Sequence, residues 1–504
     1  MNNKFLLKGN YFKAQFHQNN LGSKIIQKLA PSDTDVTLWS FLSSAEHVEE
    51  IVDSAVIGHS FWKKTSIEER IKILLKYKEN LVKKSAEIAT AIAWETGKPI
   101  WECKSEAAGL ANKVDVTISD SLPRIKNMTI TKLLPGTNGH FIYKPIGPSL
   151  VIAPFNFPCH LANGQIISLL LGGNSIIFKP SEKTAYSPQL MFECLVEAGF
   201  PSGVINLFQG GGIETNQLVI HPKIKGIFFT GSQNVGKIIA KNCSDQFSKL
   251  LALEMGGKNI SIIHKDASLN HAVAELINSC FLSSGQRCTS TGIIAVHHLI
   301  KDQLIEEFTK ATQKILVGHS IEEGDSFMGP LIDEQAENYY FDYTNKAIAE
   351  GAEIILPAKK IQKRWKGHYS TPSILFYDMT KGFKSFIGHE IFAPNVTIIP
   401  YHHIEEAIAL TNSTDYGLAS AIFTSTPQIY QKCLEEIDCG LINLNKSTVG
   451  ASARLPFGGH KNSGNYRPAA VTMIDSCVQL SSSLENWEEL NGNWKLISGL
   501  AKEI

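Results

Sequence analysis

From residue 148 onward, short apolar runs typical of β-strands alternate with runs typical of amphipathic helices, and this alternation strongly constrains the fold. The first series consists of PSLVIAPF, NGQIISLLL, SIIFKP, SPQLMFECLVEAG, GVINLFQG, KGIFFTG, NVGKIIAKNC and KLLALEM. Strand, helix and strand at this spacing predict parallel βαβ units and a doubly wound sheet. A second series starts at residues 259–265 (NISIIHK) and predicts a second α/β domain.

Two segments before these series have their own patterns. Residues 66–96 have the apolar periodicity of one long amphipathic helix, and Ser66 with Glu69 forms a capping box at its start. Residues 124–146 alternate like a β-hairpin around Pro135-Gly136. Because the hairpin lies between the first helical region and the first sheet, we expect it to leave the body of the domain.

Composition excludes several classes of protein. A chain of 504 residues is expected to form about two or three domains. Its 48 Lys and Arg balance 48 Asp and Glu, so no overall field attracts nucleic acid or anionic lipid. The longest apolar stretch, residues 166–178, is interrupted by glycines and is shorter than the about 20 residues of a membrane span. We expect no nucleic-acid or membrane partner.

The cysteines indicate a reducing compartment. The nine cysteines are scattered, none has CxxC spacing, and no nearby histidine pair completes a zinc pattern. This pattern favours reduced thiols in a cytoplasmic protein without a metal.

A glycine-containing turn follows the apolar run at residues 226–230 and opens a helical run. Its sequence is Gly231-Ser232-Gln233-Asn234-Val235-Gly236-Lys237. Backbone N–H groups at such a turn can face a phosphate. One interpretation is a P-loop, but Ile238 stands where a P-loop has a hydroxyl residue that binds Mg²⁺. The other is a dinucleotide-binding turn, but the G-x-G-x-x-G spacing of such a turn is absent. A tight turn that needs glycine only for packing explains it equally well.

Cys288 differs from the other eight cysteines, for which a buried, inert thiol is expected. It is preceded by Gly285-Gln286-Arg287 and followed by Thr289-Ser290. A flanking arginine and free N–H groups in a turn can lower the pKa of a thiol and expose it, so we expect a reactive cysteine here. A papain-like hydrolase has little support, because no Cys-His-Asn pattern can be placed.

Three further motifs have a polar residue at the end of an apolar strand. Glu254 precedes two glycines, and an ordinary pairing with Lys258 is the alternative to a function. Asn156 lies between aromatic residues and prolines, where its amide either donates to an oxyanion or forms a turn. Lys179 and Glu182 follow a strand at the sheet edge where doubly wound folds bind nucleotides.

In their order along residues 20–485, these motifs resemble those of the aldehyde dehydrogenase superfamily. The matching stretches are ETGKP (95–99), PFNFP (154–158), KPSE (179–182), FTGSQNVG (229–236), LEMGGK (253–258), GQRCT (285–289), EIFAP (390–394) and LPFGG (455–459). Eight matches in one order exclude a chance resemblance.

The resemblance implies an α/β fold with a Rossmann-like cofactor domain, an α/β catalytic domain and a small β oligomerisation element. We assign residues 1–122 and 147–256 to the NAD-binding domain and residues 257–448 to the catalytic domain. Residues 123–146 with 470–489 form the oligomerisation element, in which the run 474–482 pairs with the hairpin. The expected assembly is a homodimer or homotetramer.

The resemblance also implies a mechanism. Cys288 adds to an aldehyde, and the Asn156 amide and the Cys288 backbone N–H hold the oxyanion of the thiohemiacetal. Hydride passes to NAD, and Glu254 is the general base for the water that hydrolyses the thioester. The implied cofactor contacts are Lys179 and Glu182 at the adenosine ribose, Gly231, Ser232 and Gly236 at the pyrophosphate, and Glu390 and Phe392 at the nicotinamide. No step needs a metal.

The substrate is expected to be an acidic semialdehyde. Residues 160–164 (HLANG) and 464–468 (GNYRP) resemble a branch of the superfamily that acts on such a compound. The basic residues of the segment 445–467, which has no Asp or Glu, are Lys446, Arg454, Lys461 and Arg467. We predict Phe157, Arg454 and Arg467 as substrate contacts, and a solvated basic loop is the alternative. The rival functions are a P-loop nucleotide-binding protein and a catalytically silent member of the same fold.

Overall fold

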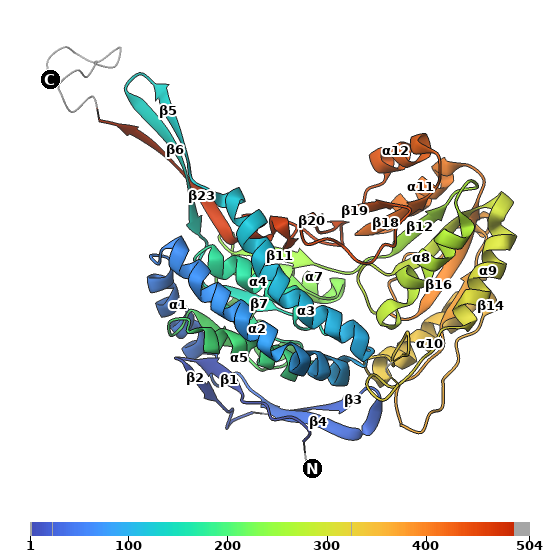
Figure 1. Ribbon diagram of the computed structural model, residues 1–504, viewed down its shortest axis with the longest axis horizontal. Coiled ribbons are helices and arrows are strands. Elements are labelled where there is room, and N and C mark those ends of the chain that lie inside the picture. Colours follow the sequence, from blue (N-terminus) through green and yellow to red (C-terminus); the bar gives the residue numbers. More distant parts are fainter. Residues whose placement is uncertain (1–2, 23, 324, 488–504) are drawn as a thin grey trace.

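Two large sheets, each flanked by helices, form the body of the protein in the computed structural model (Figure 1). The structure describes residues 3–22, 24–323 and 325–487. The helices are α1 (Val48–Trp62), α2 (Ile67–Thr96), α3 (Ile100–Val116), α4 (His160–Leu171), α5 (Tyr186–Ala198), α6 (Gly212–Ile220), α7 (Gln233–Asn242), α8 (Leu269–Phe281), α9 (Lys301–Gln313), α10 (Glu334–Ala349), α11 (Ile404–Asn412) and α12 (Pro427–Glu436). In the described residues, none of them combines the length and apolar character that crossing a bilayer requires.

The first sheet has seven strands in the order β11-β10-β7-β8-β9-β1-β2. Their bounds are β11 (Leu250–Glu254), β10 (Gly226–Thr230), β7 (Ser149–Ile152), β8 (Ile176–Lys179), β9 (Ile205–Leu207), β1 (Asn10–Phe12) and β2 (Gln15–His17). The strands from β11 to β9 are parallel, whereas β1 is antiparallel to both neighbours. The predicted parallel βαβ series is therefore confirmed.

The second sheet also has seven strands, in the order β14-β15-β16-β13-β12-β18-β19. Their bounds are β14 (Glu353–Leu356), β15 (Ser373–Phe376), β16 (Asn395–Tyr401), β13 (Thr291–His297), β12 (Asn259–Ile263), β18 (Ala419–Phe423) and β19 (Leu441–Leu444). All neighbours are parallel except β14, which is antiparallel to β15. The α/β fold class is confirmed, and the division of the chain into domains at the predicted boundaries stays a prediction.

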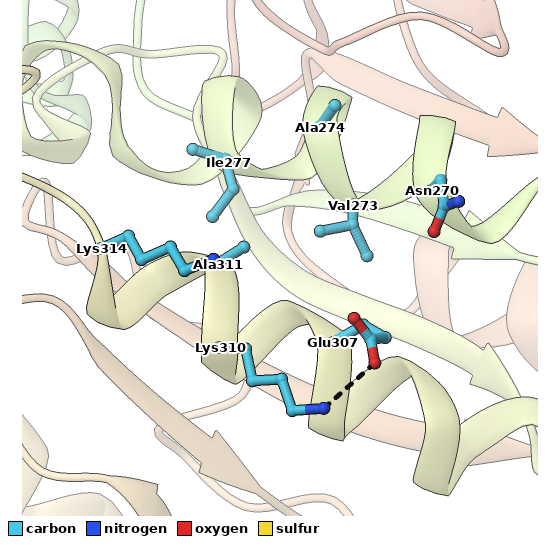
Figure 2. Close-up of a pocket in the computed structure, with 8 residues that line it drawn as sticks. All are labelled: Asn270, Val273, Ala274, Ile277, Glu307, Lys310, Ala311 and Lys314. Carbon is cyan, nitrogen blue, oxygen red and sulfur yellow. Dashed lines mark hydrogen bonds and ion pairs between the residues drawn. The ribbon is translucent and has the colours of Figure 1, made fainter.

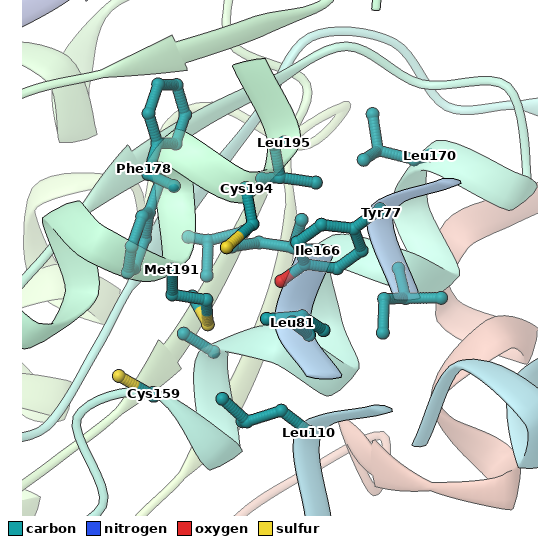
Figure 3. Packing of buried hydrophobic residues seen from close by; sticks show 14 of the residues in the cluster. Tyr77, Leu81, Leu110, Cys159, Ile166, Leu170, Phe178, Met191, Cys194 and Leu195 are labelled. Atoms are coloured by element: carbon teal, nitrogen blue, oxygen red, sulfur yellow. The ribbon is translucent and has the colours of Figure 1, made fainter. Parts of the chain in front are cut away.

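The first core lies between the first sheet and the helices that cover it (Figure 3). Helix α2 supplies Tyr77 and Leu81, which pack with Leu110 of α3, Ile166 of α4 and Met191 of α5. One of the two hydrogen bonds of the predicted capping box is present: the Ser66 hydroxyl accepts from the Glu69 N–H at 3.2 Å. The long helix predicted for residues 66–96 is confirmed within one residue.

Adjacent leucines of α2 offer a matched test of this core. Leu74 is fully buried and Leu75 is 41% exposed. Leu74→Ala should lower the free energy of unfolding by about 2–5 kcal/mol, because it removes buried apolar atoms and leaves a cavity. Leu75→Ala should change it by less than about 0.5 kcal/mol. Urea denaturation followed by tryptophan fluorescence measures both, and equal effects would contradict the packing described here.

A third sheet extends away from the body of the protein (Figure 1). It contains β5 (Met128–Leu134), β6 (Thr137–Pro145) and β23 (Val478–Asn486), all antiparallel. The predicted pairing of the hairpin with the C-terminal run is confirmed. The strand begins at Val478 rather than at residue 474, because Val471–Cys477 form a 3₁₀-helix anchored in the first core. The exposed apolar side chains of this third sheet are Met128, Ile130, Leu133, Leu134, Phe141, Leu480 and Leu484.

The remaining elements are short or lie at the edges. They are β3 (Lys24–Ala30), β4 (Asp33–Ser43), β17 (Tyr416–Gly417), β20 (Pro456–Phe457), β21 (His460–Lys461) and β22 (Ala469–Ala470). Single turns of 3₁₀- or π-helix occupy Thr117–Ser121, Leu122–Ile125, Leu282–Gly285, His298–Ile300 and Met379–Lys381. The apolar patterns did not predict the four N-terminal strands, helices α1, α3 and α6, or the individual helices and strands between α9 and the C-terminal run.

Candidate active site

The candidate residues meet where the carboxyl edge of the first sheet faces the amino ends of strands in the second sheet. Glu254 ends β11, and only four residues separate it from the start of β12 at Asn259. The Asn156 amide, which follows β7, donates to the Gln286 carbonyl at 3.0 Å. The structure therefore brings the loops that carry Asn156, Glu254 and Cys288 together from distant parts of the sequence.

Cys288 is held in place by a side chain that the sequence analysis did not single out. The Asn259 amide donates to the carbonyl oxygens of Cys288 and Ser290, both at 2.8 Å, and its own oxygen accepts from the Ala419 N–H at 2.9 Å. Cys288 is half-buried, whereas the other eight cysteines are buried, and all nine thiols are free. The signal for Asn259 was a polar residue at the start of an otherwise apolar strand.

The expected lowering of the Cys288 pKa is wrong. Burial raises the pKa of the thiol above its ordinary range, and the carboxyl groups of Glu254 and Glu390 add to this effect. The Arg287 guanidinium acts in the opposite direction but is the weaker influence. Burial therefore favours the protonated form of the Cys288 thiol in this environment.

Arg287 has only a small effect on the pKa of Cys288, because its guanidinium is already paired with another group. Its guanidinium donates to the Glu102 carboxylate at 2.6 Å and to the Ser283 hydroxyl at 2.8 Å. It also lies over the Phe157 ring, 4.9 Å from the centroid. A neighbour in sequence does not act as a free charge when its charge is satisfied by a distant carboxylate.

Glu254 is a buried carboxyl group without a partner. Only 1% of the residue is exposed, and neither oxygen has a hydrogen-bond partner in the described part of the chain. Burial raises its pKa well above the ordinary value, against the opposing effect of Arg467. The alternative pairing with Lys258 is absent among the described residues, since the Lys258 ammonium instead donates to the Tyr343 hydroxyl at 3.4 Å.

Glu390 lies against the two glycines that follow Glu254. Its carboxylate accepts from the Gly257 N–H at 3.0 Å, and a Cβ atom on Gly256 would lie only 1.9 Å from a Glu390 oxygen. Glycine is therefore required at residue 256. Burial raises the pKa of Glu390 to about 7, although the Gly257 N–H and Lys258 lower it.

Aromatic and amide side chains close the same region. Phe392 has a left-handed backbone with φ of 58°, and its ring meets Phe155 edge-on at 5.8 Å. Asn156 is 5% exposed, and its backbone carbonyl oxygen accepts from the Lys98 ammonium at 2.8 Å. One N–H of its amide is used by Gln286, which leaves the second for another acceptor.

The residues predicted to contact the adenosine ribose and the pyrophosphate follow strand ends of the first sheet. Lys179 and Glu182 form an ion pair at 2.8 Å. Burial raises the pKa of Glu182, but Lys179, a backbone N–H and Lys183 together outweigh this effect, so the net shift is downward. Ser232 caps α7 by accepting from the Val235 N–H at 3.4 Å. Both glycines of the turn also have a packing role, since a Cβ on Gly231 or Gly236 would lie within 2.5 Å of a neighbouring side chain.

The two predicted substrate arginines lie in different surroundings. Arg454 is 72% exposed in its side chain and pairs with Asp120 at 3.1 Å. Arg467 lies 2.6 Å from the His460 ring nitrogen and acts on the Glu254 carboxyl group. The structure therefore brings Arg467, but not Arg454, to the candidate site.

Two surface hollows have no part in this site. One, of about 410 Å³, lies between α8 and α9 and is lined by Asn270, Val273, Ala274, Ile277, Glu307, Lys310, Ala311 and Lys314 (Figure 2). The other, of about 520 Å³, lies at residues 132–138 with Glu485 and Trp487. Neither contains a predicted site residue. In the described residues, no group of His, Cys, Asp and Glu has the arrangement of a metal site.

The aldehyde dehydrogenase family model matches residues 17–482. An N-succinylglutamate 5-semialdehyde dehydrogenase of Legionella pneumophila is 35% identical over 483 residues, 95% of each chain. The enzyme of that name from Chromobacterium violaceum is 34% identical over 460 residues, 91% of this chain and 93% of its own.

Two solved structures are also similar. Betaine aldehyde dehydrogenase from Staphylococcus aureus, solved as a double mutant in complex with NAD⁺, is 26% identical, with a TM-score of 0.89 over 98% of this chain and 99% of its own. Lactaldehyde dehydrogenase from Escherichia coli is 27% identical, with a TM-score of 0.88 over 95% and 99%.

The two-sheet fold and the cysteine, carboxyl and amide groups at its junction are those of an α/β enzyme. The chain belongs to the aldehyde dehydrogenase family, as its motifs indicated. It is an oxidoreductase that acts on aldehydes with a nicotinamide cofactor.

Proposed function

We propose that the protein oxidises N-succinyl-L-glutamate 5-semialdehyde to N-succinyl-L-glutamate with NAD⁺, a step in arginine breakdown. The names of the relatives that are 34–35% identical over nearly the whole chain support this substrate. The observation that carries the chemistry is the meeting of Asn156, Glu254 and Cys288 at one junction.

Each of these three side chains has a role in the proposed reaction. Cys288 gives its thiol proton to solvent and adds to the aldehyde carbon as the thiolate, since an aldehyde has no leaving group. The free N–H of the Asn156 amide and the Cys288 backbone N–H donate to the oxyanion, and losing one such donor typically costs about 2.7–4 kcal/mol. Glu254 takes the proton of the water that hydrolyses the thioester, and burial, which raises its pKa well above the ordinary value, makes its carboxylate a stronger base.

The residues at the strand ends fit a dinucleotide. The exposed part of Glu182 can accept from a ribose hydroxyl, and the amino end of α7 at Ser232 can face a pyrophosphate. Gly231 and Gly236 belong to the same turn and would also lie at the pyrophosphate. Glu390, which acts on the Cys288 thiol, and Phe392 would lie at the nicotinamide. The bound cofactor supplies the acceptor for the hydride that leaves the aldehyde carbon.

The assembly and the location are part of the same proposal. We infer a homodimer or homotetramer formed through the third sheet, because its apolar side chains are exposed and its outer strands have open edges. Residues 123–146 with 470–489 would form this element, residues 1–122 and 147–256 the NAD-binding domain, and residues 257–448 the catalytic domain. Nine free thiols support a cytoplasmic location.

The first test is a direct assay. Purified protein should reduce NAD⁺ with N-succinyl-L-glutamate 5-semialdehyde, read as NADH absorbance, with a higher kcat/KM than with butanal. A higher kcat/KM for butanal would contradict the proposed substrate but leave the family activity intact.

The preference for NAD⁺ over NADP⁺ is a separate prediction. A 2′-phosphate would meet the Glu182 carboxylate, and like charges in a partly dehydrated site cost several kcal/mol, so kcat/KM should favour NAD⁺ by about 10²-fold or more. Glu182→Gln should narrow this ratio by about tenfold, whereas Lys179→Met should weaken both cofactors. Equal efficiency of the wild type with the two cofactors would show that Glu182 does not face the ribose.

A further inference from the structure

A buried network of charges lies beside the Cys288 loop. Lys98 pairs with Glu106 at 2.5 Å, and Arg287 pairs with Glu102 at 2.6 Å. The Lys98 ammonium and the Arg287 guanidinium both lie over the ring of Phe157, at 4.1 and 4.9 Å from its centroid. These two cations therefore each have a carboxylate partner.

Lys113 of α3 is a third buried cation near this network, and it has no such partner. It is 7% exposed, and in the described part of the chain no carboxylate lies within ion-pair distance of its ammonium. The ammonium donates to the His160 carbonyl at 3.2 Å and lies 3.4 Å from the His160 Nε2. A Cβ on Gly164 would lie 2.9 Å from the ammonium, so glycine there leaves room for it. A buried cation without a counter-charge costs free energy that a bound anion would recover.

His160, the first residue of α4, faces Lys113 with an acceptor. Because its Nε2 accepts from Lys113, the proton of the neutral ring is assigned to Nδ1. Nδ1 is buried and has no hydrogen-bond partner among the described residues. It lies next to Gly109, where even an added Cβ atom would stay 3.4 Å away. The His160 ring therefore turns its acceptor, and not its N–H, toward the ammonium.

We propose that the buried Lys113 ammonium recognises the carboxylate of the substrate by pairing with it, and that His160 positions this ammonium through its ring Nε2 and its backbone carbonyl oxygen. The inference rests on the proposed function and names the residues that select an acidic semialdehyde. His160 lies four residues after Asn156 and within electrostatic range of Arg287, next to Cys288. Arg454, paired with Asp120 at the surface, is not part of this site.

The test compares an acidic with a neutral substrate. Lys113→Met should raise KM for N-succinyl-L-glutamate 5-semialdehyde by about 10–100-fold, since a hydrogen bond to a charged group contributes about 1.5–3 kcal/mol. KM for butanal, and kcat for both, should change by less than about twofold. Lys113→Arg should restore part of the affinity, and His160→Phe should raise the acidic KM alone. Arg454→Met, a matched loss of a surface cation, should change neither KM.

The pH dependence gives a readout that a purely structural lysine would not show. Burial lowers the pKa of Lys113 to about 8, against the opposing effect of Glu106 on the same helix, and the neutral His160 ring faces it from α4. Lys113 is charged below this pKa and loses its charge above it. The ratio of acidic to neutral KM should therefore rise above pH about 8 in the wild type and stay flat in Lys113→Met.

The outcomes separate the two proposals. A wild type that oxidises butanal but not the acidic semialdehyde overturns the proposed substrate. A wild type that oxidises both, with equal KM changes in Lys113→Met, overturns the carboxylate site and leaves the proposed substrate standing. If Lys113→Met does not fold, thermal denaturation of the wild type and of His160→Phe, each with and without N-succinyl-L-glutamate, is the deciding test. We expect this product to raise the Tm of the wild type more than that of His160→Phe. An equal rise in the two proteins contradicts the site.

Discussion

Cys288→Ala should abolish aldehyde oxidation, with a loss in kcat of about 10⁴-fold or more, while the protein still binds NAD⁺. The reason is that hydride can leave the aldehyde carbon only after a nucleophile has added to it. Steady-state NADH formation measures the loss, and fluorescence titration with NADH measures the binding. Cys439→Ala, which removes a buried thiol at residue 439, is the matched control and should keep its activity. Turnover of the alanine variant above a trace would show that another group is the nucleophile.

Glu254→Gln should produce a different defect. The amide keeps the shape of the buried carboxyl group but cannot take a proton, so thioester hydrolysis should slow by about 10²–10⁴-fold. Rapid mixing should show a burst of NADH close to one equivalent per site, followed by a stalled steady state. Mass spectrometry of the quenched variant should find an acyl group on Cys288.

A chemical control separates this defect from misfolding. Hydroxylamine is a stronger nucleophile than water and needs less help from a base, so it should release the acyl group and restart turnover of Glu254→Gln. A variant with the full steady-state rate in water would remove Glu254 from the mechanism. A variant with no burst would place its role before hydride transfer.

Local patterns were sufficient for much of the fold. The central strands of the first sheet are short apolar runs bounded by glycine, proline or polar residues, so their type and order could be predicted. Helix α6 was missed because Gly210 and Gly211 precede it and Gly212 begins it, and glycines favour a loop. Strands β1 and β2 have three residues each, and the structure places β1 beside β9, about 195 residues later in the chain. No local sequence pattern predicts a pairing between strands so far apart in the chain.

The site shows the same limit. Asn156, Glu254 and Cys288 could be predicted because each lies in a recognisable motif at a strand end or after a helix. The environment of the thiol could not, since it depends first on how the folded chain buries Cys288, and then on Glu102, which pairs with Arg287 from 185 positions away. A local view therefore gave the wrong direction for the pKa of Cys288. Long-range ion pairs of this kind arise only when the chain has folded.

The three hydrogen bonds of Asn259 fix the nucleophile independently of the side chains that surround the substrate. Because this side chain ties the Cys288 loop to the backbone of the second sheet, the position of the sulfur depends on that sheet. The residues around Phe157 and Lys113 belong to other elements and make none of these bonds. Selection can therefore exchange the residues that sort aldehydes while the reacting atom stays fixed, so that one scaffold gives rise to enzymes with many substrates.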